Sequence, residues 1–293
     1  MILVTGATGL SGGELVRRLS QRGVPVRALV RSRAKAAALA ALPGVTVVEG
    51  DMARPDTLAA PLQGVERAML ISSSDPAMLD VQSNFIAAAK AAGVRHVVKL
   101  SGILPDVKSA FRFARMHGEI ERVLETSGLA WTHLRPGEFM QSYFRQARNI
   151  AGKGALFLPM AQARIASIDA GDVAEAAVAV LTGKGHEGKI YPLTSGEALT
   201  MDEVAARLSA ATGKPVRYVD VSPDAARQAS IANGIPEYLA DALVELFAER
   251  RAGKEATVYP TLQQVFGIRP TSFAEFAQRH AATFRGEPQA ATA

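Results

Sequence analysis

The 293-residue sequence contains no cysteine, which excludes a disulfide framework, a zinc–thiolate site and a cysteine nucleophile. It also lacks a long hydrophobic run, since no apolar stretch approaches the ~20 residues that a membrane-spanning helix needs. No charged leader or small-residue cleavage site precedes the first apolar stretch, Ile2 to Val4. Because 48% of the residues are hydrophobic, the chain can build a large core. We therefore expect a cytoplasmic globular protein that does not cross a membrane.

Acidic residues are scarce at the start of the chain. Residues 1–50 carry seven lysines and arginines against two glutamates, and this segment accounts for the net charge of +5. Nucleic acid binding normally needs a stripe of cations along a groove. A compact basic patch instead favours a small phosphate-bearing ligand, so no nucleic-acid partner is expected. For Arg17, Arg18 and Arg22, solvation of a helix face is an alternative explanation.

Short β-branched runs alternate with alanine-rich segments of helical period in the first half of the chain. This alternation predicts an α/β fold, a doubly wound Rossmann arrangement with a mainly parallel sheet. The predicted strands are Ile2–Thr5, Val26–Val30, Val45–Val48, Ala68–Ser72, His96–Leu100 and Ala130–Leu134. The predicted helices lie near residues 12–22, 33–41, 56–62, 78–92, 111–127 and 138–150.

The alternation becomes less regular after Gly152. The predicted elements there are a strand at Arg164–Ile168, a helix at Gly171–Leu181, a strand at Ile190–Leu193, a helix at Thr200–Thr212, a strand at Val216–Val221 and helices near 223–233 and 236–252. We predict a nucleotide-binding domain over residues 1–152. Residues 153–285 are predicted to form a smaller α/β substrate lobe, with 164–182 returning to the first domain. The small, polar residues 286–293 are predicted to form a disordered tail.

The first predicted strand runs directly into a glycine-rich turn with GxxGxxG spacing, followed by an amphipathic helix. Glycines there let the backbone approach a pyrophosphate, and the start of the helix offers unpaired N–H groups. A strand before the turn and a second strand about twenty residues later are the context of a dinucleotide site. The residues predicted to contact the phosphates are Gly6, Thr8, Gly9, Leu10, Ser11 and Gly12.

Cations stand at the end of the second predicted strand, where an NAD site places an acid for the ribose 2′-hydroxyl. The guanidinium groups of Arg31 and Arg33 suit a 2′-phosphate, so NADP(H) is predicted in preference to NAD(H). Asp51 follows the third strand and is placed to meet the adenine amino group. A role for Asp51 as a cap or turn residue fits its position equally well.

Several further segments resemble the atypical short-chain dehydrogenase/reductases, and more narrowly the NmrA-like group of quinone and triphenylmethane-dye reductases and redox-sensing regulators. The segments that carry the resemblance are 4–9, Gly50-Asp51, 96–101, 117–121 and 134–140, and their order and spacing fit over residues 1 to about 195. The resemblance implies an NAD(P)H site. The family pattern also implies that Pro136 and Gly137 let the chain pass close to the nicotinamide. The other predicted cofactor-binding residues are Met52, Ser72, Ser73, Lys99 and Phe139.

Active short-chain dehydrogenases carry a Tyr-x-x-x-Lys pair on the helix after the fifth strand, where the tyrosine exchanges a proton with a carbonyl oxygen. The matching spacing here falls on Phe113 and His117. Phenylalanine has no proton to donate, so alcohol–ketone and sugar-nucleotide epimerase chemistry is disfavoured.

Lys99 and Ser101 share one face of the fifth strand, at its carboxyl end, where doubly wound sheets bind ligands. A buried lysine needs an oxygen or anion partner, which a cofactor ribose, a substrate carbonyl or an acid such as Glu121 could supply. His117 is a candidate acid near the nicotinamide, with a packed helix histidine as the alternative. Lys99, Ser101 and His117 are therefore the predicted catalytic residues.

Met140 and Tyr143 have face-sharing spacing in the helix predicted after the sixth strand. They are predicted to line an apolar substrate pocket, with ordinary core packing as the alternative.

Two functions fit these patterns. The first is an NADPH-dependent oxidoreductase that transfers hydride to a small acceptor such as a quinone, enone or dye, because such acceptors do not demand a strong protein acid. The second is a non-catalytic NADP(H)-sensing regulator that acts through a protein partner. Either function allows a homodimer, and no metal site is predicted.

Overall fold

The computed structural model describes residues 1–287, and within that range no helix has the length and apolar character needed to span a membrane. Residues 286–293 were predicted to be disordered. Of these, residues 288–293 lie outside the described part of the chain.

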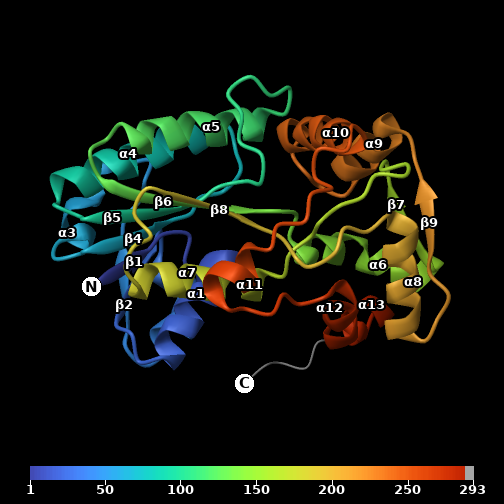
Figure 1. The fold of residues 1–293 in the computed structure, drawn as a ribbon, viewed down its shortest axis with the longest axis horizontal. Helices are drawn as coiled ribbons and strands as arrows, with labels where there is room; N and C mark the ends of the chain where they lie inside the picture. The colour runs from blue at the N-terminus through green and yellow to red at the C-terminus, as the bar shows by residue number, and fades with distance from the viewer. Residues whose placement is uncertain (288–293) are drawn as a thin grey trace.

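A seven-stranded parallel sheet forms the larger part of the molecule (Figure 1). Its strands are β1 (Ile2–Val4), β2 (Val26–Val30), β3 (Val45–Glu49), β4 (Arg67–Leu70), β5 (His96–Leu100), β6 (Ala130–Pro136) and β8 (Lys189–Leu193). The order across the sheet is β3-β2-β1-β4-β5-β6-β8, and every neighbouring pair is parallel. The direction of winding therefore reverses between β1 and β4, which confirms the predicted doubly wound α/β fold.

Helices cover both faces of this sheet because its strands are apolar on both sides. Strand β1 shows the division: Ile2 and Val4 enter one core and Leu3 the other. The helices on the first face are α1 (Leu10–Gln21), α2 (Ala37–Ala40), α7 (Ala170–Thr182) and α11 (Thr261–Phe266). Those on the second are α3 (Ala59–Leu62), α4 (Met78–Ala91) and α5 (Arg112–Glu125).

Two predicted helices are each divided in the structure. The segment predicted as 33–41 forms a 3₁₀ turn, η1 (Arg33–Lys35), and then α2, because Ala36 between them leaves the helical conformation at φ −120°. The segment predicted as 56–62 forms η2 (Pro55–Thr57) and then α3. Pro61 within α3 cannot donate a backbone hydrogen bond, which limits the length of this helix.

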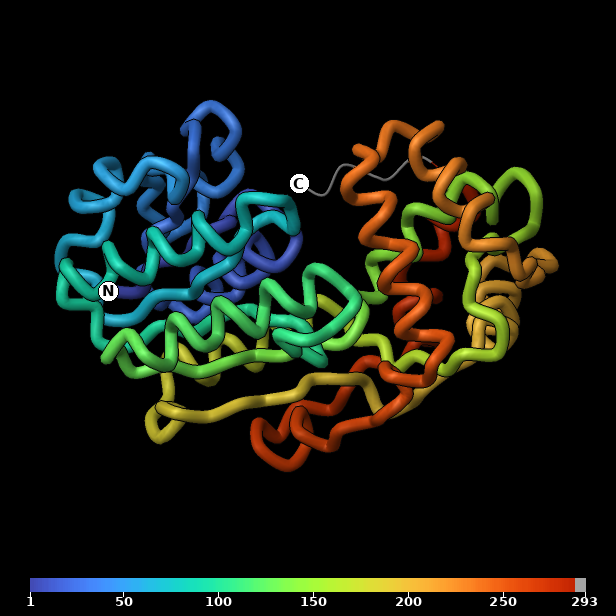
Figure 2. Tube along the Cα trace, turned by 90° about the horizontal axis from the view of Figure 1, so that it is seen from above, coloured from blue at the N-terminus to red at the C-terminus, as the bar shows by residue number. Residues whose placement is uncertain are grey.

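A smaller lobe stands beyond the carboxyl ends of the strands (Figure 2). It contains a parallel pair, β7 (Ala155–Leu158) and β9 (Arg217–Asp220), and its own core around Phe273, Phe276 and Phe284. Its helices are η3 (Met140–Gln146), α6 (Ala147–Lys153), α8 (Met201–Thr212), α9 (Pro223–Ala232), α10 (Glu237–Arg251), α12 (Phe273–Arg279) and α13 (Ala281–Arg285). The sequence did not predict β7, α11, α12 or α13.

The chain passes between the two parts more than once. Helix α7 returns to the main core, and so does β8, which pairs with β6 and lies outside the predicted returning segment 164–182. The predicted strand Arg164–Ile168 does not form. Its backbone amides bond to separate segments, Ile165 to Leu199 and Ile168 to Glu138, so no continuous ladder develops.

Candidate active site

A cavity of about 1050 Å³ lies at the carboxyl ends of β1, β4, β5 and β6. The glycine-rich turn lines one part of it and helix α10 of the smaller lobe another. This edge, where the winding reverses, is where open α/β sheets bind ligands.

The glycine-rich turn is folded tightly against the start of α1. Gly6 has φ +59°, and its carbonyl oxygen accepts a hydrogen bond from the Gly9 amide at 2.9 Å. A Cβ added to Gly12 would lie 2.3 Å from the Gly6 carbonyl oxygen, so no other residue fits there. No side chain in the described part of the molecule caps the start of α1. Its free N–H groups and positive dipole end fit a pyrophosphate.

Only some of the residues that were predicted to bind the adenosine part of the cofactor line the cavity. Arg31 lines the cavity, but Arg33 does not; it begins η1, and its amide donates to the Glu49 carboxylate at 2.8 Å. Asp51 lines the cavity as well, but its Oδ1 accepts the Ala53 amide at 2.9 Å. The carboxylate of Asp51 therefore forms the turn that was the alternative to adenine binding, with its second oxygen left for a ligand.

Most other predicted cofactor residues line the same cavity: Gly6, Thr8, Gly9, Leu10, Ser11, Gly12, Met52, Ser72, Ser73, Pro136, Gly137 and Phe139. Gly137 is required by a close approach, because a Cβ there would lie 2.4 Å from the Ala166 carbonyl oxygen. Lys99 is not part of the cavity wall; it lies behind it.

Lys99 on β5 and His117 on α5 form a pair at the floor of the cavity. Lys99 Nζ lies 2.8 Å from His117 Nδ1 and 3.3 Å from the Leu100 carbonyl oxygen. Lys99 is fully buried, whereas His117 lines the cavity. The nearest partner of the buried lysine is thus an imidazole nitrogen; the Leu100 carbonyl is an oxygen partner of the predicted kind, and the charge of Glu121 also favours the protonated amine.

The protonation of the pair follows from this geometry. Burial lowers the pKa of Lys99 to about 7, and burial together with the Lys99 charge lowers the pKa of His117 well below its usual value. A neutral His117 that accepts a hydrogen bond at Nδ1 carries its proton on Nε2. Nε2 lies on the side of Gly102, which also lines the cavity. His117 therefore offers an N–H donor with a titratable amine behind it.

Ser101 adds a hydroxyl to the same wall. Its Oγ is buried near the Glu121 carboxylate, whose pKa it helps to lower, but it makes no hydrogen bond of normal geometry to any residue in the described part of the chain. Since buried polar groups are nearly always satisfied, this hydroxyl is available to a ligand in the cavity.

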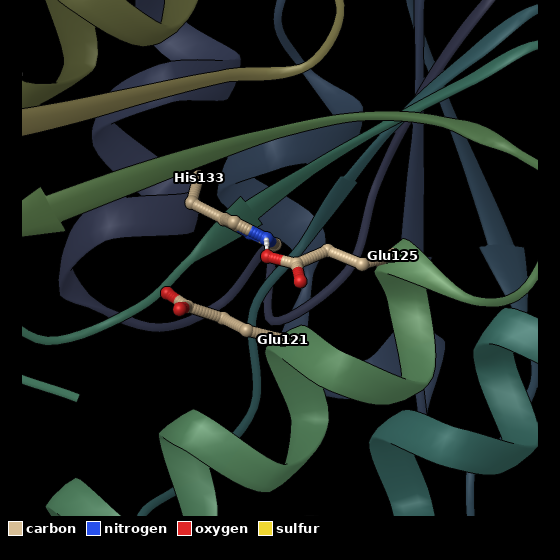
Figure 3. Close-up of side chains that lie close together, drawn as sticks. All are labelled: Glu121, Glu125 and His133. Atoms are coloured by element: carbon tan, nitrogen blue, oxygen red, sulfur yellow. Dashed lines mark hydrogen bonds and ion pairs between the residues drawn. The ribbon is translucent and has the colours of Figure 1, made fainter. Parts of the chain in front are cut away.

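A polar network lies on the α5 side of β6 (Figure 3). His133 is the in-register neighbour of Lys99, and its Nε2 lies 3.1 Å from Glu125. Arg135 binds Glu121 through two nitrogens, at 2.5 and 3.1 Å. Burial lowers the pKa of His133 to about 4. Burial alone would raise the pKa of Glu121, but the bonds from Arg135 hold it below its usual value.

The same network has the residue types of a metal site, since ligand atoms of Glu121, Glu125 and His133 lie within 4.8 Å of one another. Glu121 is already neutralised by Arg135, which leaves Glu125 as the one carboxylate of this cluster without an arginine partner among the described residues. We therefore interpret this cluster as an ion-pair network that supports β6 and α5.

The segment after β6 corrects the predicted substrate pocket. It is a 3₁₀ helix, η3, in which residues three apart share a face. Met140 and Tyr143 lie on the face that enters the core of the smaller lobe, and the Tyr143 hydroxyl contacts the Met201 sulfur at 3.7 Å. Neither residue lines the cavity. The neighbouring face, formed by Phe139, Ser142 and Arg145, does.

An apolar wall that the sequence did not predict faces the floor of the cavity. It is formed by Ile103, Leu104, Phe111, Leu239, Leu243 and Leu246. The last three belong to α10 and repeat at spacings of four and three, which marks one face of a helix. That spacing was present in the sequence, but it did not indicate which other element this face would meet.

The two parts of the molecule are joined beside this wall. Arg112 at the start of α5 binds the Glu245 carboxylate on α10 through its side chain and its backbone amide. Its guanidinium also lies 4.4 Å from the centre of the Tyr238 ring. Figure 2 shows α10, in orange, beside the start of α5, in green. This contact fixes the position of the apolar wall relative to the floor.

A doubly wound sheet with a glycine-rich turn and a cavity at its reversal point defines a dinucleotide-binding Rossmann protein. Residues 1–277 match the model of the NmrA-like family, and the chain belongs to that family.

Individual relatives agree over almost the whole chain. An NAD(P)H azoreductase from Xenophilus azovorans is 43% identical, over 97% of this chain and 99% of the azoreductase. The NADPH complex of an Escherichia coli NADPH-dependent quinone oxidoreductase superposes with a TM-score of 0.87 at 35% identity, over 95% and 99% of the two chains. The NADP(H) complex of triphenylmethane reductase from Citrobacter sp. gives a TM-score of 0.86 at 29% identity, over 96% and 100%. The chain is an NAD(P)H-dependent oxidoreductase.

Proposed function

We propose that this protein is an NADPH-dependent reductase that transfers hydride to a small planar electrophile such as a quinone, an enone or a dye. The observation that carries the proposal is that the glycine-rich turn, the His117 donor and an apolar wall line a single cavity. The azo, quinone and triphenylmethane reductases among its relatives support this class of acceptor.

The residues of the turn fit the cofactor. Gly12 allows the turn to lie close to the start of α1, because it has no Cβ. The turn and the uncapped start of α1 together form a cradle for the diphosphate. When bound, NADPH supplies a hydride to the acceptor. The protein then has to hold the acceptor against the nicotinamide and stabilise the charge that develops on it.

The floor of the cavity supplies this stabilisation. The Ser101 hydroxyl and His117 Nε2–H are donors toward the reduced oxygen or nitrogen of the acceptor. A proton that leaves His117 Nε2 is replaced at Nδ1 by one from Lys99, so the imidazole remains neutral while the ammonium becomes an amine. Phe113, in the position of the usual tyrosine, is packed against Phe111 and Tyr238 and takes no part in this transfer.

We also propose that NADPH is preferred to NADH, with Arg31 as the ligand of the 2′-phosphate. Arg31 is exposed at the edge of the cavity after β2, whereas Arg33 points outside it. The Arg31→Ala variant should raise the KM for NADPH about tenfold or more and leave that for NADH almost unchanged. Arg33→Ala is the matched control and should change neither. An equal effect on the two nucleotides would contradict the assignment.

The central test follows NADPH absorbance with a quinone, a cationic triphenylmethane dye and an azo dye. At least one acceptor should accelerate NADPH oxidation, and Lys99→Ala should reduce that rate at least about a hundredfold while calorimetry shows NADPH still bound. Tight NADPH binding without oxidation by any acceptor would instead support the regulator alternative.

A further inference from the structure

The 3₁₀ helix η3 presents a cation to the cavity. Phe139, Ser142 and Arg145 are spaced three apart, and all three line the cavity, so they form one face of η3 and of the residue before it. Ser142 donates a hydrogen bond to Glu138 at 2.8 Å. The Arg145 side chain is exposed and makes no ion pair or hydrogen bond with the described residues.

The other cations of the smaller lobe that line the cavity are neutralised. Arg250 is buried between Glu138 and Glu255, with nitrogen–oxygen distances of 3.0 and 2.9 Å. Lys254 is paired with Glu249. These pairs use all three carboxylates that the segments 137–145 and 239–255 contribute to the cavity wall. The three cations and three carboxylates on this side therefore balance in number, but Arg250 takes two of the carboxylates, and Arg145 is left without a direct partner among the described residues.

The position of Arg145 separates it from the cofactor phosphates. The phosphate-binding turn follows β1, and Arg31 follows β2 on one side of it. Helix η3 follows β6, and β4 and β5 lie between β1 and β6. A dinucleotide that crosses the reversal point has its nicotinamide on the β4–β6 side. Arg145 consequently faces the part of the cavity where the acceptor binds, together with the apolar wall of α10.

We infer that Arg145 recognises an anionic substituent on the acceptor, so that the preferred substrates are planar electrophiles carrying a sulfonate, carboxylate or phosphate group. The ring lies between Phe139 and the apolar wall, and the anionic group lies on the guanidinium, which binds such oxyanions through paired N–H donors. This inference rests on the proposed function for the identity of the ring as an acceptor, but not for the binding of the anion.

The first experiment measures binding without turnover. Calorimetry on the NADP-loaded protein compares naphthalene-2-sulfonate with the neutral naphthalene-2-sulfonamide. Arg145→Ala should weaken binding of the sulfonate about tenfold and leave that of the sulfonamide within about twofold, and Arg145→Lys should restore part of the loss. Rising salt should weaken the sulfonate complex of the wild type and not that of Arg145→Ala.

The second experiment compares NADPH oxidation by 1,4-naphthoquinone-2-sulfonate and 1,4-naphthoquinone. The KM for the sulfonate alone should rise in Arg145→Ala. Arg148→Ala is the control, since Arg148 is also exposed and does not line the cavity. Equal losses for charged and neutral ligands, weaker NADP binding in Arg145→Ala, or the same effect in Arg148→Ala would overturn the inference. Sulfonate binding by Arg145 without reduction of either quinone would instead contradict the proposed function alone.

Discussion

Lys99 is a lysine with no exposed surface, held by one carbonyl oxygen and one imidazole nitrogen. Such burial disfavours the charged amine, and the pKa of Lys99 falls to about 7 as a result. Lys99 is therefore about half protonated at neutral pH, and a proton donor is most effective when its pKa lies near the working pH. Because burying a lysine amine costs folding free energy, we expect Lys99 to be kept for a role in the reaction.

The pH dependence of the rate should report this group. Because Lys99 must be protonated to supply a proton, kcat/KM for an uncharged quinone should be constant below about pH 7 and fall as the pH rises through that value. The apparent pKa belongs to the coupled Lys99–His117 pair. Lys99→Met should remove this limb along with most of the rate, whereas Lys90→Met, on the exposed side of α4, should keep the wild-type profile.

Lys99→Met should lose activity but gain stability. The pKa of Lys99 is about 7 in the folded state, below the ordinary lysine value of 10.5, so folding releases a proton from it between pH 10.5 and about 7. Stability is therefore lost as the pH falls through this window. Lys99→Met should melt at a higher temperature than the wild type at pH 7, and a lower melting temperature would contradict the assigned pKa.

At the residue scale, the sequence predicted the burial of Lys99 and its position at a strand end, because both follow from a parallel strand. The identity of its partner could not be predicted. His117 lies 18 positions away on another element, and only the docking of α5 on β5 decides which of its ring nitrogens meets the amine.

The glycine-rich turn and α1 act as one element, and Gly12 is where they approach most closely. A Cβ at position 12 would lie 2.3 Å from the Gly6 carbonyl oxygen, so Gly12→Ala must displace the turn. We expect this variant to lose NADPH binding by at least about a hundredfold in calorimetry and to be destabilised by about 1–3 kcal/mol.

Gly152 is the matched control for that substitution. It lies within α6, and a Cβ there would meet no atom within 4 Å. Gly152→Ala should stabilise the protein by about 0.5–1 kcal/mol in denaturant unfolding, because alanine is the better helix former, and should leave NADPH binding unchanged. Similar losses of NADPH binding and stability in both variants would show that Gly12 is under no special steric constraint.

In helix η3, Met140 and Tyr143 take up the core packing that the sequence left open as the alternative to a substrate pocket. Residues 138–150 were predicted as a single helix of period 3.6, in which Met140 and Tyr143 would face the ligand. The structure instead forms a 3₁₀ helix over Met140–Gln146, and the face that these two side chains share in either helix type packs into the core of the smaller lobe. The strands and long helices were predictable from their periodicity. The local choice between two helix types depends on the packing of Phe144 and Tyr143 against α12, which no local pattern contains.

At the scale of the whole molecule, the contact of Arg112 with Glu245 and Tyr238 connects the main sheet layer to the lobe that covers its cavity. Arg112→Ala should free α10 and with it the apolar wall. We expect the acceptor KM to rise several-fold while NADPH affinity is retained. The double variant Arg112→Ala/Glu245→Ala should be little worse than Arg112→Ala alone, because the first substitution already removes the side-chain contact that Glu245 makes. Additive effects would show that the two residues act independently.

The doubly wound sheet could be predicted almost completely from residues 1–150, where strands and helices alternate regularly. The arrangement of the smaller lobe could not, because its helices are short and its core forms between segments far apart in sequence, such as Met201 on α8 and Phe273 on α12. Strand β8 was predicted as a strand, but its place beside β6 depends on a long connection with no local signal.

The repeated passage of the chain between the two parts limits how the protein can change. Helix α7, strand β8 and helix α11 belong to the main layer, while the smaller lobe takes its core residues from before α7, from between β8 and α11, and from after α11. No single exchange of a contiguous cassette could graft the lobe of a relative onto this sheet. We therefore expect new substrate ranges to be reached by point substitutions on η3 and α10 more readily than by the exchange of one contiguous segment between relatives.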